Sequence, residues 1–217
     1  MPAISSRYKL AFFDTPKVAS TSLKHVIYRL DHDQEFVPGQ GGFRHIHQVY
    51  PTVKFDPDQL EQTAGYWRFA VVRDPVSRIV SAYKNRVVRD RELQKSWRSR
   101  LRARLHGLKP QPSLEEFCLQ LPRYRKHRGT GHHTALISEF LGPDLGLYDA
   151  VFRLEDTRAV AQEIEQRTGQ DVHLRHDKKE RTSGDTLNLS KPAFDALLAY
   201  TQDEYAMLRG LYEKPQW

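Results

Sequence analysis

Several features common in other protein classes are scarce in this sequence of 217 residues. It holds one cysteine, Cys118, which excludes an internal disulfide, and we expect a buried structural thiol in a reducing compartment. No stretch approaches the roughly 18 to 20 apolar residues of a membrane-spanning helix. The Walker A pattern GxxxxGK[ST] is also missing, which argues against an ordinary nucleoside triphosphatase. We find no internal repeat or linker and predict one domain over residues 1–217.

The basic surplus is concentrated in one part of the chain. Lys and Arg outnumber Asp and Glu by 34 to 27, and residues 84–109 hold ten of the basic residues and two of the acidic ones. Trp97, Leu101 and Leu105 recur there at spacings of four, which predicts a cationic helix with an apolar stripe. Three interpretations are open: a solvated helix face, a surface that attracts a polyanionic acceptor such as an acidic glycan, and a non-specific nucleic-acid contact.

Residues 12–24, FFDTPKVASTSLK, predict a strand that turns directly into a helix. The N–H groups at a helix N-terminus can hold an anion, and Lys17 adds a positive charge at this turn. The four residues from Ala19 to Ser22 are small enough for an oxyanion to approach the backbone. Three of them carry hydroxyl groups: Ser20, Thr21 and Ser22. The alternative is that Ser20 or Thr21 only caps the helix.

Residues 67–88 repeat this design, with a predicted strand over residues 69–72 followed by an amphipathic helix. Asp74 is suited to cap that helix, and Pro75 suits its first position. Arg73, at the strand end, can make a bidentate contact to phosphate. Two anion sites of this kind indicate a ligand with two separate phosphates.

Histidines stand out between and after these motifs. His45 and His47 lie in a segment, residues 43–50, that we expect to be extended, so both side chains would share one face. A zinc site, two surface histidines and a general base are the possible interpretations, and zinc is disfavoured because neither a Cys nor a regularly spaced second pair accompanies the motif. His132 and His133 follow in a basic loop.

The order of predicted elements indicates the fold class. Strands alternate with helices, including a strand over residues 148–154 and a helix over residues 156–168 that ends at Gly169. Residues 173–186 are polar and predict a surface loop. Alternation of this kind implies an α/β domain with a central parallel sheet flanked by helices, and a ligand site at the carboxyl ends of the strands.

The segments PKVASTSLK and RDPVSRIVSAY together resemble the paired signature of sulfotransferases that use 3′-phosphoadenosine 5′-phosphosulfate (PAPS), of the carbohydrate type, similar to heparan 2-O- and chondroitin/dermatan sulfotransferases. The resemblance continues through YDAVFRLEDT and AYTQDEYAMLRGLY and covers most of the chain. It implies a three-layer P-loop-like α/β domain. It also implies transfer of a sulfuryl group to an acceptor hydroxyl, on a saccharide, without a metal.

The resemblance also implies roles for individual residues. The first motif would hold the 5′-phosphosulfate through Lys17, Val18, Ala19, Ser20, Thr21 and Ser22. The second would hold the 3′-phosphate through Arg73 and Ser81, joined by a later loop with Arg181, Thr182 and Ser183. The His-x-His spacing resembles that of uronyl 2-O-sulfotransferases, which makes His47 the general base and His45 an orienting or acceptor-binding residue. Lys17 would stabilise charge on the leaving phosphate, and His132 and His133 are acceptor contacts or alternative bases.

Two other functions are carried as alternatives. The first is a nucleotide or small-molecule kinase with a degenerate phosphate loop, for which we would expect Mg²⁺ and an acidic residue at a strand end; we do not identify one beside the first loop. The second is a non-enzymatic, basic polyanion-binding module.

Golgi enzymes of the resembled family carry an N-terminal anchor, whereas the mean hydropathy of −0.68 here is that of a soluble chain. We therefore expect a cytoplasmic enzyme or a soluble catalytic fragment of an anchored one.

Overall fold

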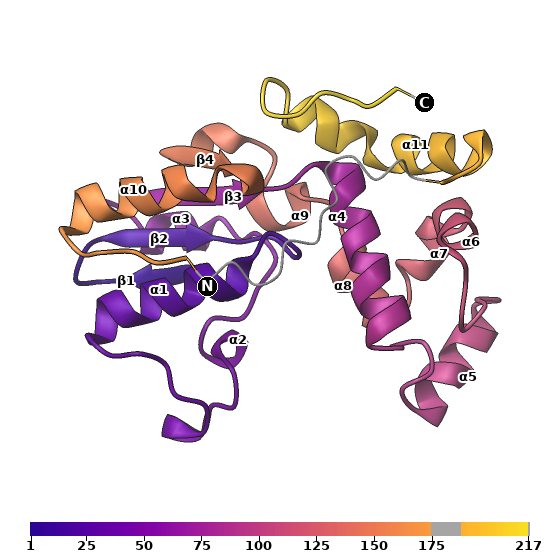
Figure 1. Cartoon of the computed structure of the whole chain (residues 1–217), viewed down its shortest axis with the longest axis horizontal. Coiled ribbons are helices and arrows are strands. Elements are labelled where there is room, and N and C mark those ends of the chain that lie inside the picture. Colours follow the sequence, from indigo (N-terminus) through magenta and orange to yellow (C-terminus); the bar gives the residue numbers. More distant parts are fainter. Residues whose placement is uncertain (175–187, 217) are drawn as a thin grey trace. The chain divides into compact units, whose positions relative to one another are not determined.

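The computed structural model of the chain describes residues 1–174 and 188–216. The chain divides into two compact units (Figure 1). The first, which we call the sheet unit, comprises Met1–Arg73 and Ile137–Glu180, and the second, the helical unit, comprises Asp74–Leu136 and Arg181–Trp217. A single domain over residues 1–217 stays a prediction.

A four-stranded sheet forms the centre of the sheet unit. Its strands are β1 (Ala3–Ser5), β2 (Leu10–Phe13), β3 (Trp67–Val72) and β4 (Ala150–Arg153), and they lie side by side in that order. The β2–β3 and β3–β4 pairs are parallel, and β1 is an antiparallel edge strand. The predicted α/β class with a central parallel sheet flanked by helices is confirmed, and the antiparallel edge strand β1 is an addition to that prediction.

Helical segments cover both faces of this sheet. On one face Phe12 stacks on Phe69, with ring centroids 5.1 Å apart, against α1 (Ser20–His32) and α10 (Thr157–Thr168). On the other face Phe13 meets the edge of Tyr148, whose hydroxyl donates to a backbone carbonyl of α9 (Ser138–Leu141). Alternate residues of a strand point to opposite faces, so the apolar run of β2 is buried on both sides.

The remaining elements of the sheet unit are short. Among the residues that the structure describes, they are α2 (Ile46–Val49), α3 (Asp58–Gln62) and three 3₁₀ turns, at Gln40–Gly42, Leu145–Leu147 and Leu154–Asp156. As predicted, α10 ends at Gly169, which has a φ of 65° and closes the helix in the left-handed conformation that favours glycine.

The helical unit begins with α4 (Pro75–Ala82), which continues as a π-helical segment, Tyr83–Arg89. The predicted start of α4 is confirmed, because the Asp74 side chain accepts from the Ser77 N–H at 2.7 Å and Pro75 is its first residue. The other helices are α5 (Trp97–Leu105), α6 (Leu114–Leu119), α7 (Leu121–Tyr124), α8 (Arg128–Thr134) and α11 (Lys191–Met207). Within the part of the chain that the structure describes, no helix combines the length and apolarity needed to cross a membrane.

The helical prediction for residues 84–109 is only partly right. Helical structure stops at Arg89 and resumes at Trp97, because Arg91 takes a left-handed φ of 48° and Leu93 is drawn into the core. Cys118 is buried in the same core, as predicted, and burial raises the pKa of its thiol to about 12, so it is not reactive.

Two interactions join α4 to α11. Arg78 and Glu204 form an ion pair of 2.6 Å, with both side chains almost fully buried. The Tyr205 hydroxyl donates to Asp74 at 2.7 Å. The C-terminal helix is therefore attached to the capping residue that begins α4.

Candidate active site

The first predicted anion loop lies between β2 and α1, as the sequence indicates. It covers residues 14–19 and contains two non-glycine residues with positive φ, Lys17 at 76° and Ala19 at 55°. Such conformations are unfavourable for residues with a Cβ and are typical of functional loops.

The start of α1 does not match the alternative in which Ser20 or Thr21 only caps the helix. The residue before the helix is Ala19, whose methyl group cannot accept a hydrogen bond. Thr21 Oγ1 lies 2.9 Å from His47 Nε2 instead. The capping interpretation is therefore wrong. The first turn of α1 presents the kind of backbone N–H donors that hold anions.

The segment that carries the two histidines differs from its prediction. We expected residues 43–50 to be extended, but Ile46–Val49 form α2, so His45 and His47 do not share the face of a strand. The Gln48 side chain accepts from the backbone N–H of Arg44 at 2.6 Å and of His45 at 3.4 Å, which stabilises the start of this short helix. The ring centroids of His45 and His47 are 6.4 Å apart, and His45 is exposed while His47 is half-buried.

A buried polar network supports His47 from within the sheet unit. Lys24, on α1, is fully buried, and its Nζ lies 2.8 Å from Asp14 Oδ2, 2.9 Å from Thr52 Oγ1 and 3.4 Å from His47 Nδ1. Thr52 donates in turn to Asp14. The three N–H donors of the ammonium group thus have three acceptors, as a buried charge requires.

Burial and this network together set the charge of His47. Its pKa is lowered to about 4, mainly by burial and then by the positive charge of Lys24, while Asp14 opposes the shift. Burial likewise lowers the pKa of Lys24, against the attraction of Asp14. His47 is therefore neutral at neutral pH, and an ammonium group that donates to Nδ1 places the remaining ring proton on Nε2.

Sequence reasoning missed Asp14, Lys24 and Thr52. One signal was available, because Lys24 lies four residues after Ser20 and three before Ile27, on the buried side of α1. Asp14 also corrects the expectation that no acidic residue ends a strand beside the first loop. Its carboxylate is paired with Lys24 and accepts from Thr52.

The residues predicted for the second site belong to different units. Arg73, at the end of β3, is 8% exposed, and its Nη1 donates to the Lys17 carbonyl oxygen at 3.4 Å. The ends of the parallel neighbours β2 and β3 are thereby connected. Ser81 is buried in α4 of the helical unit, and His132 and His133 lie on α8 of that unit, 5.1 Å apart by ring centroid. Arg181, Thr182 and Ser183 lie outside the described residues.

The residues of the sheet unit fit an anionic group. Lys17 lies in the loop of residues 14–19, Ser20 and Thr21 begin α1 directly after it, and Arg73 contacts the loop at the Lys17 carbonyl oxygen. Among residues 1–174 and 188–216, no three His, Cys, Asp or Glu side chains are grouped so that they could hold a metal ion.

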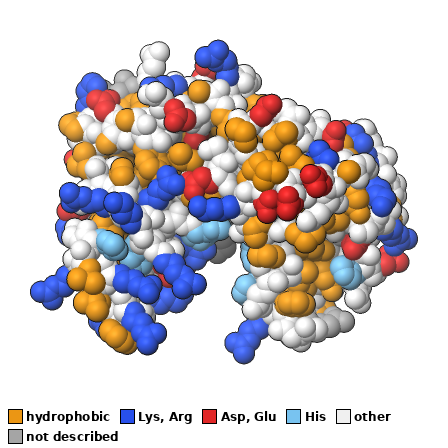
Figure 2. All heavy atoms as spheres, turned by 180° about the vertical axis from the view of Figure 1, so that it is seen from behind, with side chains coloured by type: hydrophobic (Ala, Val, Ile, Leu, Met, Phe, Trp, Pro, Cys, Tyr) orange, Lys and Arg blue, Asp and Glu red, His pale blue; other side chains and the backbone are white. Residues whose placement is uncertain are grey.

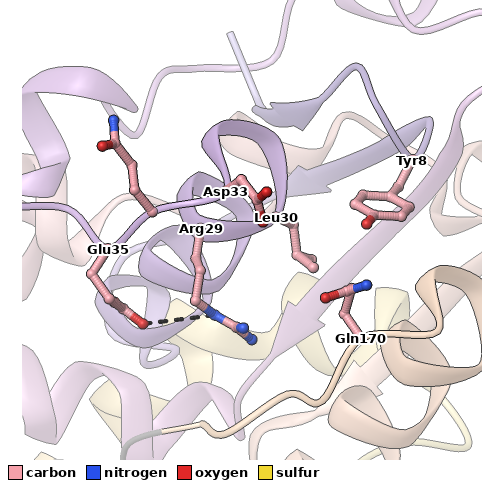
Figure 3. A pocket seen from close by; sticks show the side chains of 7 residues that line it. Tyr8, Arg29, Leu30, Asp33, Glu35 and Gln170 are labelled. Carbon is pink, nitrogen blue, oxygen red and sulfur yellow. Dashed lines mark ion pairs between the residues drawn. The ribbon is translucent and has the colours of Figure 1, made fainter.

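A cavity of about 250 Å³ lies elsewhere in the sheet unit (Figure 3). Its side chains include an Arg29–Glu35 ion pair of 3.7 Å, and it is lined by Tyr8, Arg29, Leu30, Asp33, Gln34, Glu35 and Gln170. It adjoins the C-terminal end of α1. The anion loop is at the other end, about 20 Å away at ~1.5 Å per residue, so this cavity is not the candidate site.

Curated relatives match parts of the chain. Carbohydrate sulfotransferase 14 of Mus musculus is 25% identical over 167 residues, which cover 74% of this chain and 44% of that relative. Carbohydrate sulfotransferase 10 of Xenopus laevis is 28% identical over 99 residues, 39% of this chain and 25% of the relative. The chain thus aligns with a quarter to less than half of the length of these relatives. No solved structure matches the chain significantly.

The family comparison covers nearly the whole chain. Residues 3–213 match the sulfotransferase family, a span that includes both anion motifs, the histidine segment and α11. The described fold agrees with that match, because its mainly parallel sheet carries the first motif at the carboxyl end of β2. The chain belongs to the sulfotransferase family.

Proposed function

We propose that this protein transfers a sulfuryl group from PAPS to a hydroxyl group of a saccharide. Family membership and the names of its relatives, carbohydrate sulfotransferases, support this reaction class. The observation that carries the proposal is the 2.9 Å approach of His47 Nε2 to Thr21 Oγ1, which joins a candidate base to the anion loop. Acid–base chemistry and phosphate binding can thus take place in one site.

The loop residues are proposed to bind the donor. Lys17 and the backbone of residues 18–22 would hold the 5′-phosphosulfate. Arg73 and Ser81 would hold the 3′-phosphate, together with Arg181, Thr182 and Ser183. When bound, PAPS supplies a sulfuryl group activated by its phosphate leaving group. Lys17 offsets the negative charge that develops on that phosphate, with the N-terminus of α1 beside it.

His47 is proposed to accept the proton of the acceptor hydroxyl at Nε2. The low pKa keeps the ring neutral, as a base must be. In the structure Lys24 faces Nδ1, an arrangement that leaves the ring proton on Nε2. For Nε2 to accept a proton, the ring proton must first be on Nδ1. Lys24 must therefore move away from Nδ1, its weakest contact at 3.4 Å, while it keeps its contacts with Asp14 and Thr52.

An acidic saccharide is the proposed acceptor. The net charge of +7 favours an anionic partner, and the relatives act on carbohydrates by name. His45, His132 and His133 are proposed to contact it. His45 is exposed and sits one residue before α2, in the same segment as the proposed base.

Calorimetry and a transfer assay test the proposal together. We expect 3′,5′-ADP to bind without metal and more tightly than ATP with Mg²⁺, and labelled sulfate to pass from PAPS to at least one glycan of a panel. His47→Ala should reduce turnover by about 100-fold or more and leave 3′,5′-ADP binding intact. His32→Ala, on the last turn of α1, is the matched control and should have no effect. Preference for ATP with Mg²⁺ would instead favour the kinase alternative. Asp14 would then supply the acidic residue at a strand end that a kinase needs.

A further inference from the structure

Helix α5 exposes an unusual amount of apolar surface. Trp97 is 63% exposed, Leu101 47% and Leu105 75%. These residues recur every fourth position, so they form one stripe along the outer side of the helix. The opposite side attaches α5 to the core of the helical unit through Ala103, which is fully buried. The stripe is therefore not the core-facing side of an amphipathic helix.

Arginines border this stripe on both sides. At about 100° per residue, Arg98 and Arg102 fall along one edge and Arg100 and Arg104 along the other. All four are exposed, and within the described residues none forms an ion pair with a carboxylate. The Arg98 guanidinium lies 5.4 Å from the centre of the Trp97 ring. Figure 2, in which the region of α5 is at the lower left, shows apolar side chains with Lys and Arg beside them.

We propose that α5 is a docking helix for an anionic lipid surface. Trp97, Leu101 and Leu105 would enter the boundary between headgroups and acyl chains. The flanking arginines would meet lipid phosphates while their aliphatic stems remain on the apolar side. Positive charge near such a surface adds attraction that depends on anionic lipids and falls with salt.

The composition of this surface disfavours other occupants. An acidic glycan or a nucleic acid would satisfy the arginines but offers no apolar partner for Leu101 and Leu105, whose burial supplies much of the binding free energy. A second copy of this face would bring arginines against arginines. A bilayer offers both anionic headgroups and apolar depth, so it matches the charge and the stripe together.

Flotation of the full chain with vesicles tests the proposal. We expect binding to vesicles that contain phosphatidylglycerol, much weaker binding to pure phosphatidylcholine, and loss of binding at high salt. The variant Trp97→Ser/Leu101→Ser/Leu105→Ser keeps every charge of α5 and should weaken vesicle binding by about tenfold or more. Leu119→Ser, a change at an apolar residue that is 47% exposed on α6, is the matched control and should bind as the unmodified chain does.

The results separate lipid from glycan binding and from catalysis. Circular dichroism should show that the triple variant is folded, and its binding of 3′,5′-ADP should be unchanged. A triple variant that binds anionic vesicles like the unmodified chain would overturn the proposal. So would an unmodified chain that binds heparin but no vesicle, which would assign α5 to a polyanionic glycan.

Discussion

Lys24 Nζ lies 3.4 Å from Nδ1 of His47, so a buried ammonium group faces the proposed catalytic base. A carboxylate in that place would raise the pKa of an imidazole, whereas an ammonium lowers it. Asp14 sits one step further back, at 2.8 Å from Lys24. Burial and the charge of Lys24 together keep His47 neutral, and Asp14 balances the buried charge of the lysine.

Replacement of Lys24 by Met should raise the pKa of His47 from about 4 toward its ordinary value of about 6.5. If His47 is the base, the acid limb of kcat/KM should move to higher pH by the same amount. NMR titration of the imidazole nitrogens measures the pKa directly and reports which nitrogen carries the proton. The double variant Lys24→Met/Asp14→Asn, which leaves no unpaired buried carboxylate, serves as the control for misfolding. An unshifted His47 titration in both variants would contradict this role of Lys24.

Stability should depend on His47 in the acid range. Its pKa is lowered in the folded state, so between about pH 6.5 and about pH 4 the unfolded chain binds more protons at this position than the folded chain. The contribution of neutral His47 to the free energy of unfolding is therefore lost as pH falls through that window. Chemical denaturation as a function of pH should show a shallower decline for His47→Gln than for the unmodified chain. Parallel curves would mean that His47 titrates normally.

Replacement of Lys17 by Ala should damage turnover far more than folding. Lys17 is half-buried in the anion loop, and a lost charge at a developing anion typically costs about 100-fold or more in rate. Lys9→Ala is the matched control, because Lys9 is another lysine with positive φ, at 53°, outside the loop. We expect both variants to unfold at similar temperatures and only Lys17→Ala to lose transfer activity. Equal losses of thermal stability and activity in Lys17→Ala would return this loop to a purely structural role.

The Arg78–Glu204 pair should be essential to the helical unit. Replacement of Arg78 by Met leaves the Glu204 carboxylate buried without its cation and should reduce the free energy of unfolding by about 3 to 5 kcal/mol. The double variant Arg78→Met/Glu204→Leu should recover most of that loss, because two apolar side chains carry no desolvation cost. Asp195→Asn breaks the exposed Lys191–Asp195 pair of 2.6 Å on α11 and should change stability by less than about 1 kcal/mol. Equal losses from the buried and exposed pairs would contradict this ranking.

Local sequence patterns were sufficient for much of the fold. The apolar run before a Pro-Lys corner predicted β2 and the start of α1, and Asp74-Pro75 predicted the start of α4. Gly169 predicted the end of α10. Each of these features depends on residues within a few positions of one another, because strand periodicity, caps and proline geometry act at short range.

The sequence by itself therefore determined the two strand-to-helix loops and their family resemblance, while the tertiary structure decided what surrounds His47. A four-residue helix such as α2 has too short a periodic pattern to be recognised, and it places the His47 ring beside Thr21. The burial of Lys24 depends on Asp14 and Thr52, which approach it only once the sheet unit has folded. A charge can be buried only where partners from other segments compensate for its lost hydration, and no local pattern of residues specifies such partners.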